Sequence, residues 1–174
     1  MIYKTTLPSP VGTLTLSSDG AALTGLWIEN QKYFFPHGED AVSRPELAIF
    51  ERARLWLDAY FDGRRPDISL LPLSPQGSEF AKLIWSLLCN IPYGETTTYG
   101  ALAAKAAEAM GRAHMSAQAV GGAVGHNPIS IIIPCHRVLG ANGSLTGYAG
   151  GLERKLYLLN HERQTLIYKN TSHP

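Results

Sequence analysis

The sequence predicts an α/β (α+β) protein with a small N-terminal sheet-plus-helix domain (residues 1–76) and a mainly helical C-terminal domain (residues 77–174). Three observations predict it. Short apolar segments separated by turn residues fill the start of the chain, as in small sheets. A stretch rich in proline, serine and glycine at residues 71–77 resembles a linker. Helical spacing of apolar residues dominates the rest, so we expect a winged-helix-like, helix-turn-helix architecture there.

The N-terminal part contains strand patterns followed by one helix. The expected strands are residues 2–7, 11–17 and 21–28, with turns at Ser9-Pro10 and Ser18–Gly20. Residues 30–44 are expected to be irregular. Pro45 suits the first turn of a helix whose apolar spacing runs from Leu47 to Phe61, and Gly63 should end it. No chemical motif stands out, so this part is interpreted as a scaffold.

The C-terminal part begins with three helical segments. The expected helices are Ser78 to about Asn90, Thr98 to Met110 with Thr97 or Thr98 as its cap, and a third segment, 117–125, capped by Ser116. The last two, joined by a short connection, have the outline of a helix-turn-helix unit. A final helix is expected from Leu152 to about Glu162, with a last strand at Leu166–Tyr168.

The third helical segment contains adjacent glycines, Gly121 and Gly122. Each costs a helix about 1 kcal/mol relative to alanine, so something close to the backbone should justify them. One explanation is tight packing between helices. The other is contact with a nucleic-acid backbone. An Ala/Gly surface with Gln118 as its polar side chain would suit minor-groove contact better than base readout in the major groove.

Composition narrows the class of protein. Hydrophobic residues make up 45% and charged residues 17%, which is ordinary for a globular protein, and we expect no membrane association. Residues 1–80 contain 7 Lys/Arg and 10 Asp/Glu, whereas residues 81–174 contain 8 and 4. The basic second half is compatible with a polyanionic partner. Two cysteines do not form a disulfide framework, so a cytoplasmic location is expected. No metal-ligand spacing is present.

The stretch Ile129–Val138 carries the most specific chemistry. Its β-branched apolar residues predict a buried strand, which Pro134 should end. Cys135 and His136 would then follow the strand end, where reactive groups are often presented. Cys89, near the apolar face of its helix, is instead interpreted as a small buried hydrophobe.

A cysteine at pH 7 needs a neighbour that stabilises or creates its thiolate. His136 is the candidate base, acting through a turn or a bridging water, because adjacent residues of a strand face opposite sides. Glu162 is the candidate for orienting the imidazole. Glu162 is expected at the C-terminal end of a helix, where the helix dipole disfavours a negative charge. A buried imidazole partner would compensate for this unfavourable position. An exposed glutamate there is the alternative.

These residues closely resemble the O6-alkylguanine-DNA alkyltransferase family. The Pro-Cys-His-Arg-Val motif at 134–138 matches the family's active-site sequence. The other matching segments are Ile91-Pro-Tyr-Gly-Glu-Thr, Tyr99, Ala119-Val-Gly-Gly122, Asn127-Pro128, Gly147–Gly151 and Leu158–Glu162. The resemblance is continuous over about residues 78–163. The N-terminal half resembles the α/β domain of the family only loosely.

The resemblance implies repair of alkylated double-stranded DNA by a monomeric protein that uses no cofactor. The family binds the minor groove and flips the damaged nucleotide, because a thiolate cannot reach a base inside the stack. Cys135 would take the alkyl group of O6-alkylguanine, and to a lesser extent of O4-alkylthymine, once per molecule.

Family roles carry over to matching positions. His136, oriented by Glu162, would deprotonate Cys135, and Tyr99 would protonate the leaving guanine. Asn127 would brace the turn before the active site. The Cys135 and Val138 carbonyls, the Tyr148 ring and the Ala149 backbone N–H would contact the base. Gln118, Ala119 and Gly121 would contact DNA. Gln118 replaces the arginine of the best-known members, which removes a charge, and Ala149 replaces a serine found in some.

Three other interpretations compete. A non-catalytic alkyltransferase-like protein would lack Cys135. A Cys/His hydrolase would leave Tyr99 and the Ala/Gly helix without a role. A plain helix-turn-helix interaction module would leave the Pro-Cys-His sequence unexplained.

Overall fold

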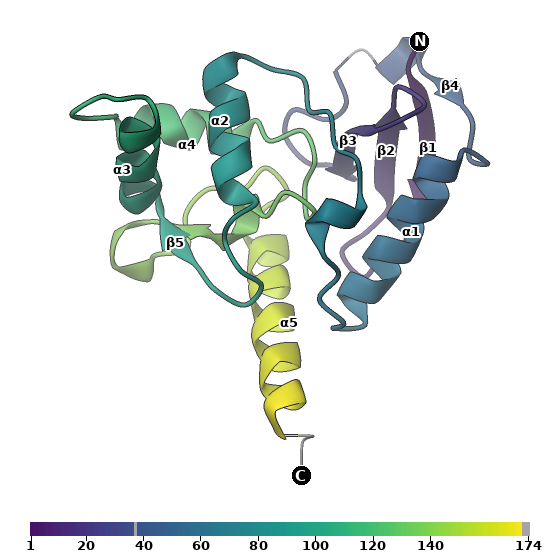
Figure 1. Ribbon diagram of the computed structural model, residues 1–174. Helices are drawn as coiled ribbons and strands as arrows, with labels where there is room; N and C mark the ends of the chain where they lie inside the picture. Colours follow the sequence, from purple (N-terminus) through teal and green to yellow (C-terminus); the bar gives the residue numbers. More distant parts are fainter. Residues whose placement is uncertain (37, 172–174) are drawn as a thin grey trace.

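The computed structural model describes residues 1–36 and 38–171 and has a sheet part and a helical part (Figure 1). The sheet is formed by β1 (Tyr3–Leu7), β2 (Leu14–Ser18), β3 (Leu23–Ile28) and β4 (Val42–Ser43), in the order β3-β2-β1-β4. The first three strands pair antiparallel and β4 pairs parallel to β1. The three predicted strands are therefore present, and the α+β class is confirmed.

One helix, α1 (Ala48–Phe61), covers the sheet. Its apolar residues recur every three or four positions and are buried: Ile49, Phe50, Ala53, Trp56, Leu57 and Tyr60. The helix begins three residues after Pro45, because residues 45 and 46 form a turn. Gly63 leaves the helix with a φ of +75°, as its position predicted.

Two segments from later in the chain cover the free edge of β3. The Leu23 backbone N–H donates to the Pro72 carbonyl (2.9 Å), so residues 71–77 run along the sheet rather than as a free linker. The Leu26 backbone N–H donates to the Pro128 carbonyl (2.8 Å). Buried side chains of both halves form one hydrophobic cluster. The division at residue 76 stays a prediction, and residues 172–174 of the predicted second domain lie outside the described chain.

Three helices follow: α2 (Glu79–Leu88), α3 (Tyr99–Ala109) and α4 (Ala117–Gly125). Their N-caps are Ser78, Thr98 and Ser116, each accepting from a backbone N–H of the first turn. The predicted caps are confirmed, with Thr98 rather than Thr97. α3 and α4 pack together as the helix-turn-helix unit, and β5 (Thr97–Thr98) pairs in parallel with β6 (Val138–Leu139).

The predicted strand at 129–133 is wrong. The isoleucines are buried as expected, but Ile129 forms only an isolated bridge to Leu26, and the chain then turns. Ile131 has a φ of +72°, and the Ile133 backbone N–H donates to the Ile129 carbonyl (3.1 Å). The backbone satisfies its hydrogen bonds within this turn, so no ladder extends toward Cys135.

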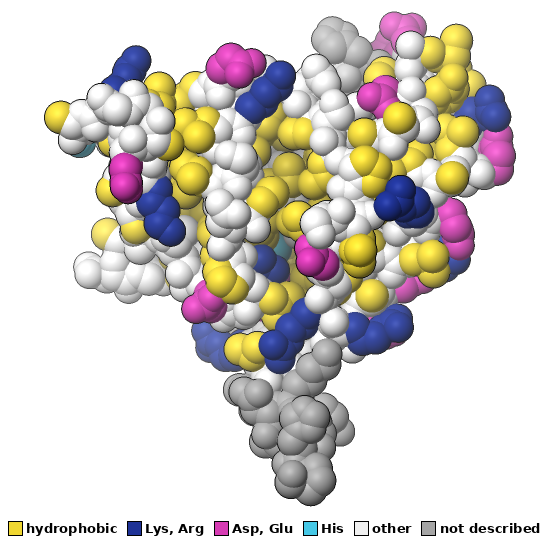
Figure 2. Space-filling model, in the orientation of Figure 1, with side chains coloured by type: hydrophobic (Ala, Val, Ile, Leu, Met, Phe, Trp, Pro, Cys, Tyr) yellow, Lys and Arg dark blue, Asp and Glu magenta, His cyan; other side chains and the backbone are white. Residues whose placement is uncertain are grey.

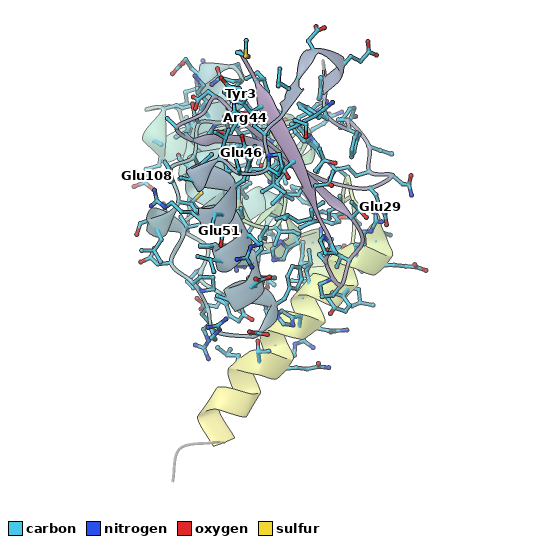
Figure 3. The ribbon with its side chains drawn as sticks, turned by 90° about the vertical axis from the view of Figure 1, so that its right-hand side faces the viewer. Tyr3, Glu29, Arg44, Glu46, Glu51 and Glu108 are labelled. Carbon is cyan, nitrogen blue, oxygen red and sulfur yellow. The ribbon has the colours of Figure 1, made fainter. Side chains whose placement is uncertain are left out.

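The last helix is longer than predicted. α5 spans Leu152–Thr171 and includes Leu166–Tyr168, where the sequence predicted a strand. No glycine or proline interrupts this range, so the helical hydrogen bonds continue. Its second half projects from the body of the molecule (Figures 1 and 3). Its first turn lies beside Glu29 (Figure 3), whose carbonyl accepts from the Arg154 guanidinium (2.6 Å).

The surface drawn in Figure 2 carries no large area of a single charge sign. Lys and Arg side chains alternate with Asp and Glu over both halves, and apolar side chains gather between α2 and α1. Among the described residues, no helix is long and apolar enough to cross a bilayer.

Candidate active site

Asn127 builds the turn that positions Cys135. Its side-chain N–H donates to the carbonyls of Ile133 (2.9 Å) and Ile129 (3.3 Å), and its Oδ1 accepts from the Ile129 backbone N–H (3.0 Å). These side-chain hydrogen bonds take the place of the backbone hydrogen bonds that a neighbouring strand would have provided. Pro134 follows, and Cys135 opens a short 3₁₀ turn, Cys135–Arg137. The thiol and the imidazole therefore come from a tight turn, not from opposite faces of a strand.

Cys135 lies at a cavity of about 190 Å³ between α4 and the loop that precedes α5. The cavity is lined by Lys32, Tyr33, Tyr99, Gly121, Val124, Gly125, Cys135, Gly147, Tyr148 and Ala149. Five residues predicted from the sequence are among them: Tyr99, Gly121, Cys135, Tyr148 and Ala149. Cys135 is only 6% exposed, so a reacting group would meet the sulfur inside the cavity.

The other predicted residues lie around the cavity rather than in its wall. His136, Glu162, Asn127 and Val138 are buried behind it. Gln118 and Ala119 are exposed in the first turn of α4. The structure therefore separates a buried group around the sulfur from an exposed group on the second helix of the helix-turn-helix unit.

Glu162 accepts hydrogen bonds from four residues. His136 Nε2 lies 2.5 Å from Oε2, and the Tyr60 hydroxyl donates to the same oxygen (2.6 Å). Arg137 Nε donates to Oε1 (2.8 Å), as does the Gly94 backbone N–H (3.0 Å). The residue lies inside α5 and not at a helix end, so the helix-end argument for it was wrong. Its contact with His136 is nevertheless direct.

The protonation states follow from this geometry. Burial raises the pKa of Glu162, but the hydrogen bond from His136 and the charge of Arg137 outweigh burial and hold the pKa well below its usual range. Burial lowers the pKa of His136, so its ring is neutral at pH 7. Because an ionised carboxylate cannot donate, Nε2 carries the ring proton and Nδ1 is the acceptor. Among the described residues Nδ1 has no hydrogen-bond partner.

Burial also raises the pKa of the Cys135 thiol, an effect that Asn127 and the Lys155 ammonium partly offset. The thiol is thus protonated at pH 7 and needs a base to become nucleophilic. Tyr99, whose hydroxyl donates to the Thr146 carbonyl (3.3 Å), has its pKa raised by burial and by Cys135. A protonated phenol at this position can act as a hydrogen-bond donor.

Lys155 was missed by the sequence reasoning. It is fully buried, and its ammonium donates to the carbonyls of Val138 (2.6 Å), Thr146 (2.9 Å) and Gly147 (3.0 Å). Burial lowers its pKa to about 8. These bonds tie the loop before α5 to β6. A signal was present: Lys155 shares a helix face with Leu158 and Glu162, at spacings of three and four residues.

Arg137 and Tyr60 were also missed as partners of Glu162. Arg137 belongs to the recognised motif but received no role, although its Nη1 also donates to the Ile91 carbonyl (2.7 Å). Tyr60 lies in α1, far along the sequence from Glu162, and no sequence pattern links the two.

Tight helix packing does not explain the glycines of α4. A Cβ at Gly122 or Gly125 would meet no atom within 4 Å in the described part of the chain, and at Gly121 it would make only ordinary contact with the Tyr99 ring. The backbone of this helix face is thus accessible. Within residues 1–36 and 38–171, no group of three or more His, Cys, Asp or Glu side chains could hold a metal ion.

The fold and site define a helix-turn-helix protein with a cysteine side chain at a cavity beside the second helix. The chain matches the family 6-O-methylguanine DNA methyltransferase, as its DNA binding domain over residues 79–164 and its ribonuclease-like domain over residues 2–75. A methylated-DNA–protein-cysteine methyltransferase of Haemophilus influenzae is 44% identical, over 98% of this chain and 91% of that relative. The chain therefore belongs to the 6-O-methylguanine DNA methyltransferase family.

Solved structures agree with this assignment. The O6-methylguanine methyltransferase of Mycobacterium tuberculosis superposes with a TM-score of 0.80 at 42% identity, covering 95% of this chain and 94% of that one. The OGT of the same organism in complex with DNA gives a TM-score of 0.82 at 40% identity, over 94% of each chain.

Proposed function

We propose that this protein repairs alkylated double-stranded DNA by moving the alkyl group from O6 of guanine to Cys135, once per molecule. O4-alkylthymine would be a lesser substrate. The observation that carries the proposal is a thiol inside a cavity, with a neutral imidazole and an ionised carboxylate directly behind it. Membership of the methyltransferase family and the DNA complex of a relative support it.

The reaction balances without a cofactor. His136 Nδ1 takes the thiol proton of Cys135 through a bridging water, and Glu162 stabilises the resulting imidazolium. The thiolate attacks the alkyl carbon in line, so an S–C bond forms as the C–O6 bond breaks. Tyr99 donates its hydroxyl proton to the guanine ring as O6 leaves, and the imidazolium proton can restore the phenol. The thioether remains on Cys135, so no second turnover follows.

The base would be held by backbone groups at the cavity. The Cys135 and Val138 carbonyls would accept from the exocyclic amine, and the Ala149 backbone N–H would donate to O6. The Val138 carbonyl already accepts from Lys155, but a carbonyl oxygen has a second lone pair for the base. The Tyr148 ring would close one side of the cavity.

DNA would bind along α4, in the minor groove, with the damaged nucleotide flipped into the cavity. The accessible glycine face of α4 supports close approach of a DNA backbone. Ala119 and Gly121 would follow the groove, and Gln118 would fill the place of the extruded base. We further propose a monomeric, cytoplasmic protein with residues 1–76 and 77–174 as its domains.

The proposal is tested by incubating the protein with duplex DNA that contains O6-methylguanine and measuring the intact protein by mass spectrometry. One CH₂ should be added per molecule, on the peptide that contains Cys135. Cys135→Ala should take no adduct, whereas Cys89→Ala, which removes the other free cysteine, should take it normally. Multiple turnovers without a lasting adduct would instead indicate a Cys/His hydrolase.

A further inference from the structure

The N-terminal half contributes to the wall of the Cys135 cavity. Lys32 and Tyr33 line it, although both belong to the irregular segment after β3 that the sequence interpretation treated as scaffold. The remaining lining residues come from α3, α4, the Cys135 turn and the loop before α5. Nothing in the reaction proposed above uses Lys32 or Tyr33.

Hydrogen bonds hold this segment against the site. The Gln31 side chain is 7% exposed, and its Oε1 accepts from the Ile28 backbone N–H (2.7 Å) and from the Ser130 hydroxyl (3.4 Å). The Lys32 backbone N–H donates to the Ala149 carbonyl (2.9 Å). The segment is thus bonded both to the turn that precedes Cys135 and to the loop that carries Tyr148 and Ala149.

Aromatic contacts fix the direction of the Tyr33 ring. The ring stacks on His126, the C-cap of α4, with centroids 4.0 Å apart and 24° between the planes. Phe35 stacks on Trp27 (4.4 Å) and anchors the far end of the segment. Tyr33 and Phe35 both have positive φ values, 57° and 27°. Such conformations persist only where surrounding contacts impose them, and they cluster at ligand clamps.

We propose that Tyr33, braced by His126, forms the outer wall of the cavity and limits the size of the alkyl group that reaches Cys135. This inference rests on the alkyl transfer proposed above. A methyl group on O6 needs little room beyond the base itself. A benzyl group is much larger than a methyl group, so its acceptance by a cavity of about 190 Å³ depends on how far the Tyr33 wall can move. Because contacts hold the segment on both sides of Tyr33, we expect this wall to move little.

The test compares single-turnover transfer rates from duplexes containing O6-methylguanine or O6-benzylguanine. Tyr33→Ala removes the ring and should raise the benzyl-to-methyl rate ratio by about tenfold or more, the discrimination typical of a changed pocket wall. Tyr33→Phe keeps the ring and should leave the ratio unchanged. Phe34→Ala is the matched control, because the neighbouring Phe34 is exposed as Tyr33 is but does not line the cavity.

A folded Tyr33→Ala protein with an unchanged ratio would overturn the inference. So would an equal fall of both rates, which would make Tyr33 a general DNA contact. Should Tyr33→Ala fail to fold in a thermal melt, His126→Ala removes the brace instead; a raised ratio supports the wall, and an unchanged one overturns it. Absence of methyl transfer by the unaltered protein would refute the proposed function itself, which keeps the two failures distinct.

Discussion

Replacing Glu162 by glutamine tests the buried network behind Cys135. The two side chains have nearly the same shape, but an amide has one accepting oxygen where the carboxylate has two. Oε1 accepts from Arg137 and Gly94, and Oε2 accepts from His136, Tyr60 and Arg137. Whichever way the amide faces, at least two donors lose their acceptor, and the nearly buried guanidinium loses its counter-charge.

Two effects of different size should follow from Glu162→Gln. Removing one partner of a buried ion pair destabilises a protein by about 3–5 kcal/mol, so urea unfolding should show a loss of this order. The imidazolium formed during transfer would no longer face a carboxylate. General-base assistance contributes about 10²–10⁴-fold, so the single-turnover rate should fall within that range.

The pH dependence separates this explanation from a general loss of structure. The folded pKa of Glu162 lies below its unfolded value of about 4.3, so its ionisation stabilises the fold above that pH and the contribution is lost as the pH falls further. The stability difference between the unaltered protein and Glu162→Gln should therefore shrink below about pH 4. Glu153→Gln, at an exposed site in the first turn of the same helix, is the control. An unchanged rate and an unchanged pH–rate profile in Glu162→Gln would refute the relay.

Three further substitutions address other parts of the site. Gln118→Arg should tighten DNA binding and steepen the salt dependence by about one counterion, and an unaltered slope across a salt series would count against contact at that position. Lys155→Met removes the donor to three carbonyls and should slow transfer. Because the pKa of Lys155 is about 8, the unaltered protein should lose rate above that pH, and Lys155→Met should lack this decline in a pH series. Asn127→Ala leaves buried backbone groups unpaired and should lower the free energy of unfolding by about 1–3 kcal/mol in urea. Asn160→Ala, at an exposed site, is the control and should cause no such loss. Equal stability of the two variants would contradict the bracing role of Asn127.

Local sequence chemistry was sufficient for much of the fold. Ser78, Thr98 and Ser116 cap the helices they were expected to cap, because a side-chain oxygen bonds a backbone N–H only two or three residues away. Gly63 ends α1 for a similarly local reason. The Pro-Cys-His motif and its flanking segments are sufficient to indicate the family, which the matches over both halves of the chain confirm.

The errors arose where a distant contact outweighed the local pattern. The apolar residues 129–133 have strand composition, but the Asn127 side chain captures their backbone groups and turns the chain. Glu162 was sought at a helix end, yet it lies inside α5, because nothing breaks the helix after it.

The sequence by itself determined the helix-turn-helix unit and the placement of Cys135 directly beside His136, since each depends on residues close together in the chain. Only the tertiary structure decided what surrounds the sulfur. Tyr60 and Glu162 are 102 positions apart, and Tyr33 and His126 belong to opposite halves. Packing of the two halves around one core brings these side chains together, and that packing is a property of the whole chain rather than of any short segment.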